Sequence, residues 1–336
     1  ITFEIECHTW PEQHKPWALR SVFPTQRGQI RGQRVRACAV SITPQMAKAL
    51  RVSSLFGVAG KSVLVTGGGR GIGKMIAEGF VANGSTVYIS SRDQTTLEAT
   101  ADELTAAHSS DGGGCCVAVP GNLYTRAGCE ELAATMGGLV PDGLHVLVNN
   151  SGVSWAEPLD RTSGQRSNWG WDRVLDLNVK APFYLTRALL PALRRAAAPA
   201  DPARVVMIGS VAGVHHQSLP THAYDASKAA LHSLTRKLAY DLAREAAAAA
   251  EGSGEGEAGG RVTANAIAPG FIRTKMTAGL ALDKLEQVVP LGRMGEGSDI
   301  AGAAIFLASP AAAWISGAIL PVDGGILTQP LDLGGV

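Results

Sequence analysis

Residues 62–73 read SVLVTGGGRGIG: an apolar run, a glycine-rich turn and the start of a helical stretch at 71–83. Such a turn lets backbone N–H groups and the positive end of the helix dipole approach a phosphate, which side chains at the glycine positions would block. The glycines alone could also mark a structural turn. Because a strand precedes them and a helix follows them, the segment predicts a dinucleotide-binding site at the start of an α/β domain.

Apolar runs alternate with longer helical stretches after this segment, which is the pattern of βαβ units. Strands are expected at Ser62–Val65, Thr86–Ser90, Cys115–Val119, His145–Val148, Arg204–Ile208, Val262–Ile267 and Ala318–Val322. Helices are expected at Gly71–Asn83, Gln94–His108, Thr125–Met136, Trp171–Ala197, His222–Ala249 and Ser298–Leu307, with N-caps at Asp93 and Ser298. Most of the strands are continuously apolar. The expected fold class is therefore α/β, a Rossmann-type doubly wound sandwich with a seven-stranded parallel sheet flanked by helices on both faces.

Composition and charge exclude several other classes of protein. The 336 residues include 30 Lys and Arg against 29 Asp and Glu, so the charge balance gives no reason to expect nucleic-acid binding. The five cysteines form no CxxC pair and no Cys/His cluster, so neither a metal site nor a disulfide framework is expected. The longest uncharged run, 301–322, contains Ser309, Pro310, Ser316 and Gly317. It is expected to form a helix end, a turn and a buried strand, and not a membrane span.

The chain is expected to divide into an extension and a domain. Residues 13–60 contain eight basic side chains and no acidic one, so residues 1–54 are interpreted as a basic N-terminal extension: a targeting peptide, a poorly ordered arm or a wrongly assigned start. The expected location is cytoplasmic, or mitochondrial if the extension is a transit peptide. Residues 55–336 are expected to form one Rossmann-type domain, with a low-complexity insertion at 246–260 that forms a solvated loop.

Further segments extend the pattern of the glycine turn. The turn has the spacing TGxxxGxG at 66–73, residues 149–152 read NNSG, 224–228 read YDASK, 269–274 read PGFIRT and 322–325 read VDGG. Ser210 lies fourteen residues before Tyr224, and Asn178 lies in the triplet LNV. As a set, these motifs resemble the short-chain dehydrogenase/reductase family over residues 55–328. Within that family the chain is most similar to the 3-oxoacyl-(acyl-carrier-protein) reductases, including those of rhamnolipid biosynthesis.

The resemblance implies a catalytic set of Ser210, Tyr224, Lys228 and Asn178. Tyr224 would be the acid/base, Ser210 would orient the substrate oxygen, and Asn178 would hold a water in a proton relay. Tyr224 and Lys228 lie four residues apart on one helix face, so the ammonium is expected to favour the ionised phenol and lower its pKa. A serine hydrolase built on Ser210 and a nearby histidine is disfavoured, because the chain has no GxSxG segment.

The cofactor residues follow from the glycine turn and from the resemblance. They are Thr66, Gly67, Gly69, Arg70, Gly71, Ile72, Gly73, Ser91, Arg92, Asn122, Leu123, Asn150, Gly152, Tyr224, Lys228, Pro269, Gly270, Ile272 and Thr274. An NAD site has an acidic side chain at the end of the second strand, whereas the 2′-phosphate of NADP needs positive charge. Arg92, Ser91 and Arg70 form such a phosphate clamp, so NADP(H) is expected in preference to NAD. Asp93 is acidic and would favour NAD instead, but it is interpreted as the N-cap of the next helix.

The expected activity is that of an NADPH-dependent carbonyl reductase or alcohol dehydrogenase, with Tyr224 as the proton donor. A 3-oxoacyl thioester or a similar apolar ketone is the expected substrate, because residues 270–295 include Phe271, Ile272, Met276, Leu280, Leu282, Leu285 and Val288. A polyketide, steroid, terpenoid or polyol substrate stays open, and so does a non-catalytic NADP-binding regulatory protein. The resemblance also implies acyl carrier protein as a partner and a homotetramer or homodimer formed through the helices at 171–197 and 222–249.

Overall fold

A computed structural model describes residues 48–109, 112–160, 169–252, 260–274 and 286–329, apart from the side chains of 169 and 249–252. Seven strands form one sheet in the order β3-β2-β1-β4-β5-β6-β7, and every neighbouring pair is parallel. They are β1 (Ser62–Thr66), β2 (Thr86–Ser90), β3 (Cys115–Ala118), β4 (Val146–Asn149), β5 (Ala203–Ile208), β6 (Val262–Pro269) and β7 (Ile319–Val322). The strand order reverses between β1 and β4, which is where open α/β sheets bind ligands. The prediction of a seven-stranded parallel sheet is confirmed.

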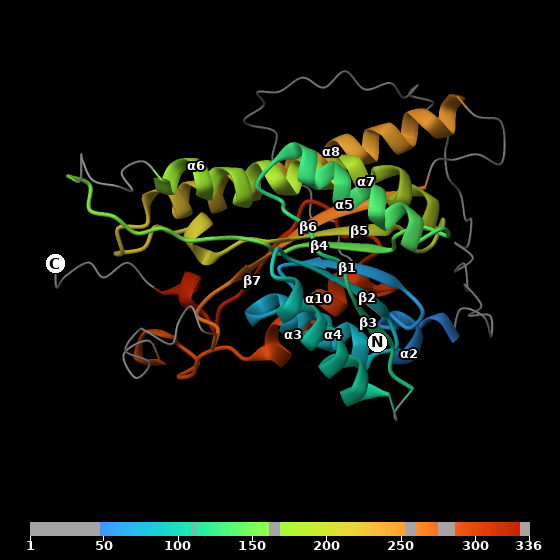
Figure 1. Cartoon of the computed structure of the whole chain (residues 1–336), viewed down its shortest axis with the longest axis horizontal. Helices are drawn as coiled ribbons and strands as arrows, with labels where there is room; N and C mark the ends of the chain where they lie inside the picture. The colour runs from blue at the N-terminus through green and yellow to red at the C-terminus, as the bar shows by residue number, and fades with distance from the viewer. Residues whose placement is uncertain (1–47, 110–111, 161–168, 253–259, 275–285, 330–336) are drawn as a thin grey trace, which may run out of the picture. The chain divides into compact units, whose positions relative to one another are not determined.

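Helices cover both faces of this sheet (Figure 1). One layer consists of α5 (Arg126–Leu139), α6 (Trp169–Leu175), α7 (Ala181–Ala196) and α8 (His222–Gly252). The other consists of α3 (Gly71–Ala82), α4 (Gln94–His108) and α10 (Gly297–Ala308), with the short α2 (Val52–Leu55) beside α10. The ring of Phe56, next to α2, lies 6.2 Å from that of Phe306. The expected doubly wound sandwich is therefore confirmed.

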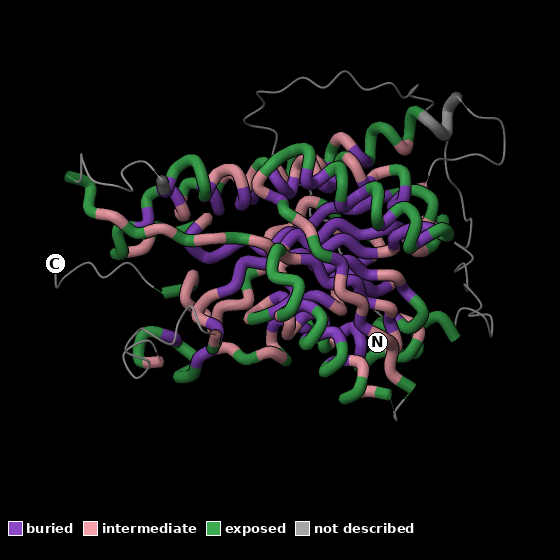
Figure 2. Tube along the Cα trace, viewed as in Figure 1, coloured by how far each residue is buried: buried purple, intermediate pink, exposed green. Residues whose placement is uncertain are grey.

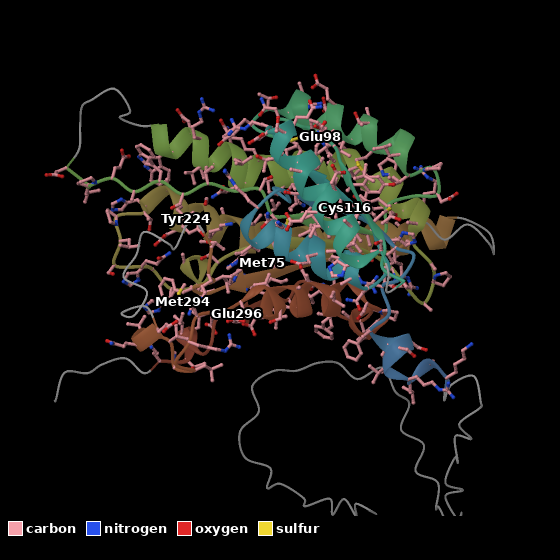
Figure 3. All side chains as sticks on the ribbon, turned by 60° about the horizontal axis from the view of Figure 1, so that its bottom comes forward. Met75, Glu98, Cys116, Tyr224, Met294 and Glu296 are labelled. Atoms are coloured by element: carbon pink, nitrogen blue, oxygen red, sulfur yellow. The ribbon has the colours of Figure 1, made fainter. Side chains whose placement is uncertain are left out.

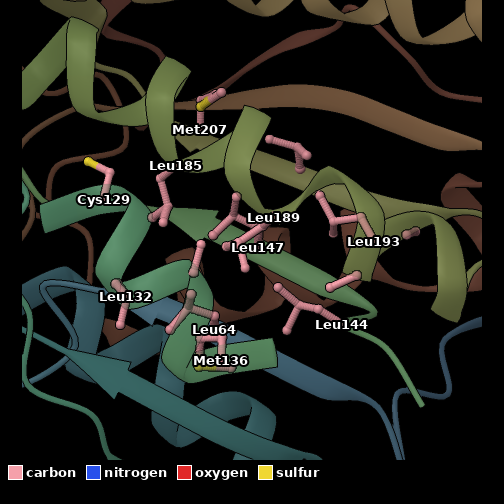
Figure 4. Packing of buried hydrophobic residues seen from close by; sticks show 14 of the residues in the cluster. Leu64, Cys129, Leu132, Met136, Leu144, Leu147, Leu185, Leu189, Leu193 and Met207 are labelled. Atoms are coloured by element: carbon pink, nitrogen blue, oxygen red, sulfur yellow. The ribbon is translucent and has the colours of Figure 1, made fainter. Parts of the chain in front are cut away.

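Two apolar clusters, one on each face of the sheet, form the core. Because side chains alternate along a strand, Leu64 of β1 packs into the first cluster and Val65 into the second. The first cluster, drawn in Figure 4, joins Leu64 to helix residues such as Leu185. The second joins Val65 to Ile76 and Leu307. Strands β4, β5 and β6 are buried throughout, as Figure 2 shows, which explains why most of their residues are apolar.

One of the two expected helix caps is present. Asp93 caps α4, because the Thr96 backbone N–H donates to its carboxylate at 3.1 Å and the Thr96 hydroxyl at 2.7 Å. The prediction that Ser298 caps the last helix is wrong. α10 already begins at Gly297, with Glu296 as its N-cap, because Asp299 reaches back to accept the Glu296 backbone N–H at 2.8 Å.

Two helix boundaries also differ from expectation. The single helix expected at 171–197 consists of α6, a π-helical turn η1 (Asp176–Lys180) and α7. The loop expected at 246–260 is helical as far as Gly252, since its alanine run favours helix, and residues 253–259 lie outside the described residues. Residues 1–47 of the expected extension lie outside the described residues, and the boundary expected after residue 54 lies within α2, so the division into an extension and a domain stays a prediction.

The uncharged run at 301–322 forms the end of α10, the 3-10 turn η3 (Pro310–Ala312) and strand β7. The predicted order of helix end, turn and strand is confirmed. Strand β7 is half-buried and not fully buried, because it is the last strand of the sheet. Among the helices of the described ranges, none combines the length and the apolar character needed to cross a membrane.

Candidate active site

The glycine turn between β1 and α3 has a backbone that larger residues would not tolerate. Gly67 and Gly71 have φ angles of +67° and +56°, in the left-handed region that favours glycine. A Cβ atom on Gly73 would lie 2.3 Å from the Gly67 carbonyl oxygen. The turn, which Gly69, Arg70 and Ile72 complete, therefore brings bare backbone to the start of α3, where N–H groups can bind phosphate. This cradle fits the pyrophosphate of a dinucleotide.

Thr66 and Asn150 fasten the turn to the neighbouring strand β4. The buried Thr66 hydroxyl accepts the backbone N–H groups of Asn150 at 3.0 Å and of Ser151 at 2.9 Å. The Asn150 side chain donates to the Thr66 carbonyl at 2.8 Å. From the side of α4, the Thr100 hydroxyl donates to the Gly69 carbonyl at 3.0 Å. Thr66 and Asn150, both expected as cofactor residues, thus shape the backbone of the turn.

The loop after β2 carries the residues expected to select the cofactor. Arg92 is exposed, and its guanidinium carbon lies 4.9 Å from the centre of the Tyr124 ring. Hydrogen bonds from Thr96, and then the positive charge of Arg70, hold the pKa of the Asp93 carboxyl below its usual value. The Asp93 carboxylate thus caps α4, as predicted. In the part of the chain that the structure describes, Arg92 has no carboxylate partner.

Backbone contacts join the ends of β2 and β3 next to this loop. The Gly121 N–H donates to the Ser91 carbonyl at 3.0 Å. The exposed Asn122 accepts the Tyr124 backbone N–H at 3.3 Å, whereas the side chain of Leu123 is buried in the core. Of these two expected cofactor residues, Asn122 is the one that presents a polar side chain at this edge.

The loop after β6 lies against the glycine turn. The Gly270 N–H donates to the Val322 carbonyl at 3.0 Å, directly after Pro269 ends β6. Ile272 is buried and pairs with Gly295. A Cβ atom on Gly71 would lie 3.8 Å from the Thr274 methyl group. The two segments expected to bind the cofactor are therefore neighbours in space, although about 200 residues separate them in the sequence.

Ser210 and Tyr224 face one another across the carboxyl end of β5. Ser210 follows this strand, and its hydroxyl accepts the Ala212 N–H at 3.1 Å in the 3-10 turn η2 (Val211–Gly213). Tyr224 is half-buried in the first turn of α8 and is labelled in Figure 3, at the same end of the molecule as Met294. Burial raises the pKa of the Tyr224 phenol, and the nearby Ser210 hydroxyl opposes this effect.

Lys228 lies beside the phenol but does not lower its pKa. Its side chain is buried, and Nζ donates to the Ile208 carbonyl at 2.7 Å. Nζ is 5.5 Å from the centre of the Tyr224 ring. Burial lowers the pKa of Lys228 itself to about 8. The expectation that Lys228 lowers the pKa of Tyr224 is therefore wrong for this structure, because desolvation of the phenol is the larger effect.

Asn178 lies in the π-helical turn and connects three parts of the site. Its side-chain oxygen accepts the Val153 N–H at 2.9 Å, and its amide donates to the Val153 carbonyl at 2.9 Å and to the Ser227 hydroxyl at 3.0 Å. The Ser227 hydroxyl donates in turn to the Tyr224 carbonyl at 2.7 Å. Both amide hydrogens of Asn178 are thus used within the protein. A Cβ atom on Gly152 would lie 3.2 Å from the Asn178 oxygen.

Sequence analysis missed two buried side chains that support the catalytic set. Ser227 lies inside the YDASK segment, so the sequence already indicated that it is close to Tyr224 and Lys228. His232 follows Lys228 by one helical turn, and burial lowers its pKa to about 4. A Cβ atom on Gly209, the residue before Ser210, would lie 2.2 Å from the His232 ring. The spacing of four residues placed His232 on the face of Lys228, but it could not reveal the contact with Gly209.

A pocket of about 280 Å³ adjoins the expected cofactor residue Ile272. Phe271, Val289 and Leu291 contribute apolar side chains to it, and Arg293 pairs with Asp299 in its wall at 2.7 and 2.9 Å. Four residues of the expected apolar substrate region lie outside the described residues: Met276, Leu280, Leu282 and Leu285. Within the described ranges, no three His, Cys, Asp or Glu side chains are arranged to hold a metal ion.

Comparison with known sequences identifies relatives over most of the chain. A family model described as "short chain dehydrogenase" matches residues 61–285, and one described as "Enoyl-(Acyl carrier protein) reductase" matches residues 253–327. The chain is 39% identical over 275 residues to a rhamnolipids biosynthesis 3-oxoacyl-[acyl-carrier-protein] reductase of Pseudomonas aeruginosa, covering 80% of this chain and 97% of the relative. It is 33% identical over 278 residues to a galactitol 2-dehydrogenase (L-tagatose-forming) of Cereibacter sphaeroides, covering 81% and 97%.

Solved structures give the same result. An RhlG/NADP active-site complex of Pseudomonas aeruginosa matches with a TM-score of 0.71 and 39% identity, over 81% of this chain and 98% of that chain. A putative NAD(P)-dependent gluconate 5-dehydrogenase of Beutenbergia cavernae with bound NADP matches with a TM-score of 0.67 and 33% identity, over 82% and 99%. The sheet order, the glycine cradle and these matches agree, and the chain belongs to the short-chain dehydrogenase family of oxidoreductases.

Proposed function

We propose that this protein is an NADPH-dependent reductase that converts the keto group of a 3-oxoacyl thioester, or of a similar apolar ketone, into an alcohol. The observation that carries the proposal is the closeness of the Ser210 hydroxyl to the Tyr224 phenol, with Lys228 beside them at the carboxyl end of β5. The use of NADP is supported by the NADP complexes among the relatives and by the exposed Arg92. The substrate class is that of the 39% identical relative.

The residues of the chain would bind the carbonyl oxygen and supply its proton, while bound NADPH supplies the hydride. The hydroxyls of Ser210 and Tyr224 would both donate to this oxygen and stabilise the negative charge that develops on it. The raised pKa of Tyr224 keeps the phenol protonated at neutral pH, which is the state that a proton donor needs. Lys228 donates one N–H to Ile208 and has two more for the ribose hydroxyls. Asn178 would hold the water of the relay through atoms other than its two amide hydrogens.

Partners and location belong to the same proposal. The 3-oxoacyl-[acyl-carrier-protein] reductases among the relatives support acyl carrier protein as the carrier of the substrate. The long helices α7 and α8 would form the subunit contacts of a homotetramer or homodimer, and a monomeric sedimentation profile would contradict this. The proposed location is cytoplasmic, or mitochondrial if residues 1–54 are a transit peptide.

The test is the initial rate of NADPH and NADH oxidation with an acetoacetyl thioester, beside a panel of cyclic ketones and sugars. We expect rapid, NADPH-selective reduction of the thioester. Tyr224→Phe should abolish turnover and leave NADPH binding intact, whereas Tyr240→Phe, a matched control further along α8, should change neither. Turnover by Tyr224→Phe would refute the mechanism. Activity on a sugar alone would refute the substrate class, and NADPH binding without turnover by the unmodified protein would favour a regulatory function.

A further inference from the structure

Two arginine side chains from different parts of the chain lie over the same tyrosine ring. The guanidinium carbon of Arg92, in the loop after β2, is 4.9 Å from the centre of the Tyr124 ring. That of Arg173, on α6, is 5.1 Å from the same centre. Tyr124 itself lies between β3 and α5. Both distances are within the range of cation–π attraction, so three separate segments converge on one ring.

The positive charge of Arg92 is not cancelled by the acidic residue next to it. Asp93 follows Arg92 directly, but its carboxylate accepts two hydrogen bonds from Thr96 and caps α4. Arg126, two residues after Tyr124, differs from Arg92, because its guanidinium pairs with Glu130 at 2.7 Å. The Arg92 guanidinium can therefore form a charge-assisted hydrogen bond with an anion, and the charge of Arg173 near the same ring would add to the attraction.

The position of the cluster in the fold determines which anion it would meet. In parallel sheets that bind dinucleotides, the end of the second strand lies next to the 2′ position of the adenosine ribose. Arg92 is the second residue after β2, and the glycine cradle for the pyrophosphate is at the end of the adjacent β1. A guanidinium stacked on a ring keeps its N–H donors in its own plane, where they can reach an anion beyond the ring edge.

We propose that Tyr124 is a positioning residue for cofactor selectivity, and that Arg173 acts with Arg92 on the 2′-phosphate of NADP. The Tyr124 ring restricts the Arg92 side chain before the cofactor binds, so less conformational freedom is lost on binding. It also brings the charge of Arg173, which the sequence separates from Arg92 by 81 residues, to the same place. The inference rests on the proposed use of NADPH and extends it to two residues outside the expected clamp.

Binding of two adenosine nucleotides to the full-length protein tests the inference without catalysis. Isothermal titration calorimetry would compare 2′,5′-ADP, which carries the 2′-phosphate, with 5′-AMP, which lacks it. Tyr124→Leu removes the ring, Tyr124→Phe keeps it, and Arg173→Gln removes the second charge. Tyr240→Leu is the matched control, because Tyr240 on α8 also lies near two cations, Lys237 at 5.7 Å and Arg244 at 5.8 Å.

We expect Tyr124→Leu and Arg173→Gln to weaken the binding of 2′,5′-ADP by about threefold to tenfold and to leave that of 5′-AMP unchanged. Tyr124→Phe and Tyr240→Leu should bind both nucleotides like the unmodified protein. If Tyr124→Leu weakens both nucleotides equally, or neither, the selectivity role of Tyr124 is refuted. Unchanged binding by Arg173→Gln refutes the role of Arg173. If the unmodified protein itself does not prefer 2′,5′-ADP, the proposed cofactor fails, and this inference fails with it.

Discussion

A buried histidine next to Ser210 should make the folded protein sensitive to acid. His232 is 2% exposed, and its ring lies between Gly209 and Gly213, which flank Ser210. Neither ring nitrogen has a hydrogen-bond partner within the described part of the chain. A proton on this ring would place a second buried positive charge one helical turn from Lys228. The ring must therefore stay neutral in the folded protein.

The size of the effect follows from the pKa of His232. Burial, and then the charges of Lys228 and Arg236, lower this pKa from 6.5 to about 4. A contact with the Gly213 backbone acts in the opposite direction, but it does not meet hydrogen-bond geometry. Between pH 6.5 and pH 4 the unfolded chain binds a proton that the folded chain does not, so stability falls as the pH falls. At about 1.4 kcal/mol per pH unit, the loss is about 3 kcal/mol over this window.

Urea unfolding of the unmodified protein and of His232→Leu, followed by tryptophan fluorescence, measures this loss. From about pH 7 to about pH 5, the free energy of unfolding should fall by about 2 kcal/mol more in the unmodified protein than in the variant. His216→Leu, at an exposed position, serves as the control and should follow the unmodified protein. If the free energy of unfolding has the same pH dependence in His232→Leu as in the unmodified protein, the assignment of a buried neutral ring is wrong.

Two further substitutions test other parts of the structure. Gly73→Ala should weaken NADPH binding by at least about a hundredfold in a fluorescence titration, because the new methyl group would lie 2.3 Å from the turn's own backbone. Binding like that of the unmodified protein would mean that the cradle tolerates a side chain. Asp201→Asn should lower the free energy of unfolding by about 3 kcal/mol, because Asp201 pairs with both Lys61 and Arg204, which are buried. An unchanged urea midpoint would show that the Asp201 carboxylate does not offset the free-energy cost of burying Lys61 and Arg204.

Most of the fold could be predicted because its signals are local. Strands such as β4 and β5 are buried on both faces, so each is a short, mainly apolar run, which its length and its β-branched residues distinguish from a buried helix. The wrong cap of α10 has a local cause as well. Serine is a good cap in general, but here the Glu296 backbone N–H donates to Asp299, and this bond places the N-cap at Glu296, two residues before Ser298.

The candidate site was only partly predictable, because motifs give positions in the sequence and not environments. The glycine turn and the YDASK segment identified the cradle and Tyr224, and the structure brings these segments to the same edge of the sheet. The convergence of Arg92 and Arg173 on Tyr124 depends on how three distant segments pack, which no spacing reveals. The pKa of Tyr224 was predicted in the wrong direction for the same reason: its spacing from Lys228 indicated a nearby charge, but not the burial that outweighs it.

The protonation states of Tyr224 and Lys228 also bear on the direction of the reaction. Reduction needs a protonated phenol, whereas oxidation needs a phenolate, which burial of Tyr224 opposes. As the pH rises, Lys228 loses its proton first, at about 8, so the ammonium is lost before the phenol ionises. Near neutral pH the phenol is protonated, which is the state that reduction needs. Above about pH 8, Lys228 loses its charge and one of its three N–H donors, so the rate of reduction should fall there. A rate of ketone reduction that increased across this range would contradict the proposed role of the Lys228 ammonium.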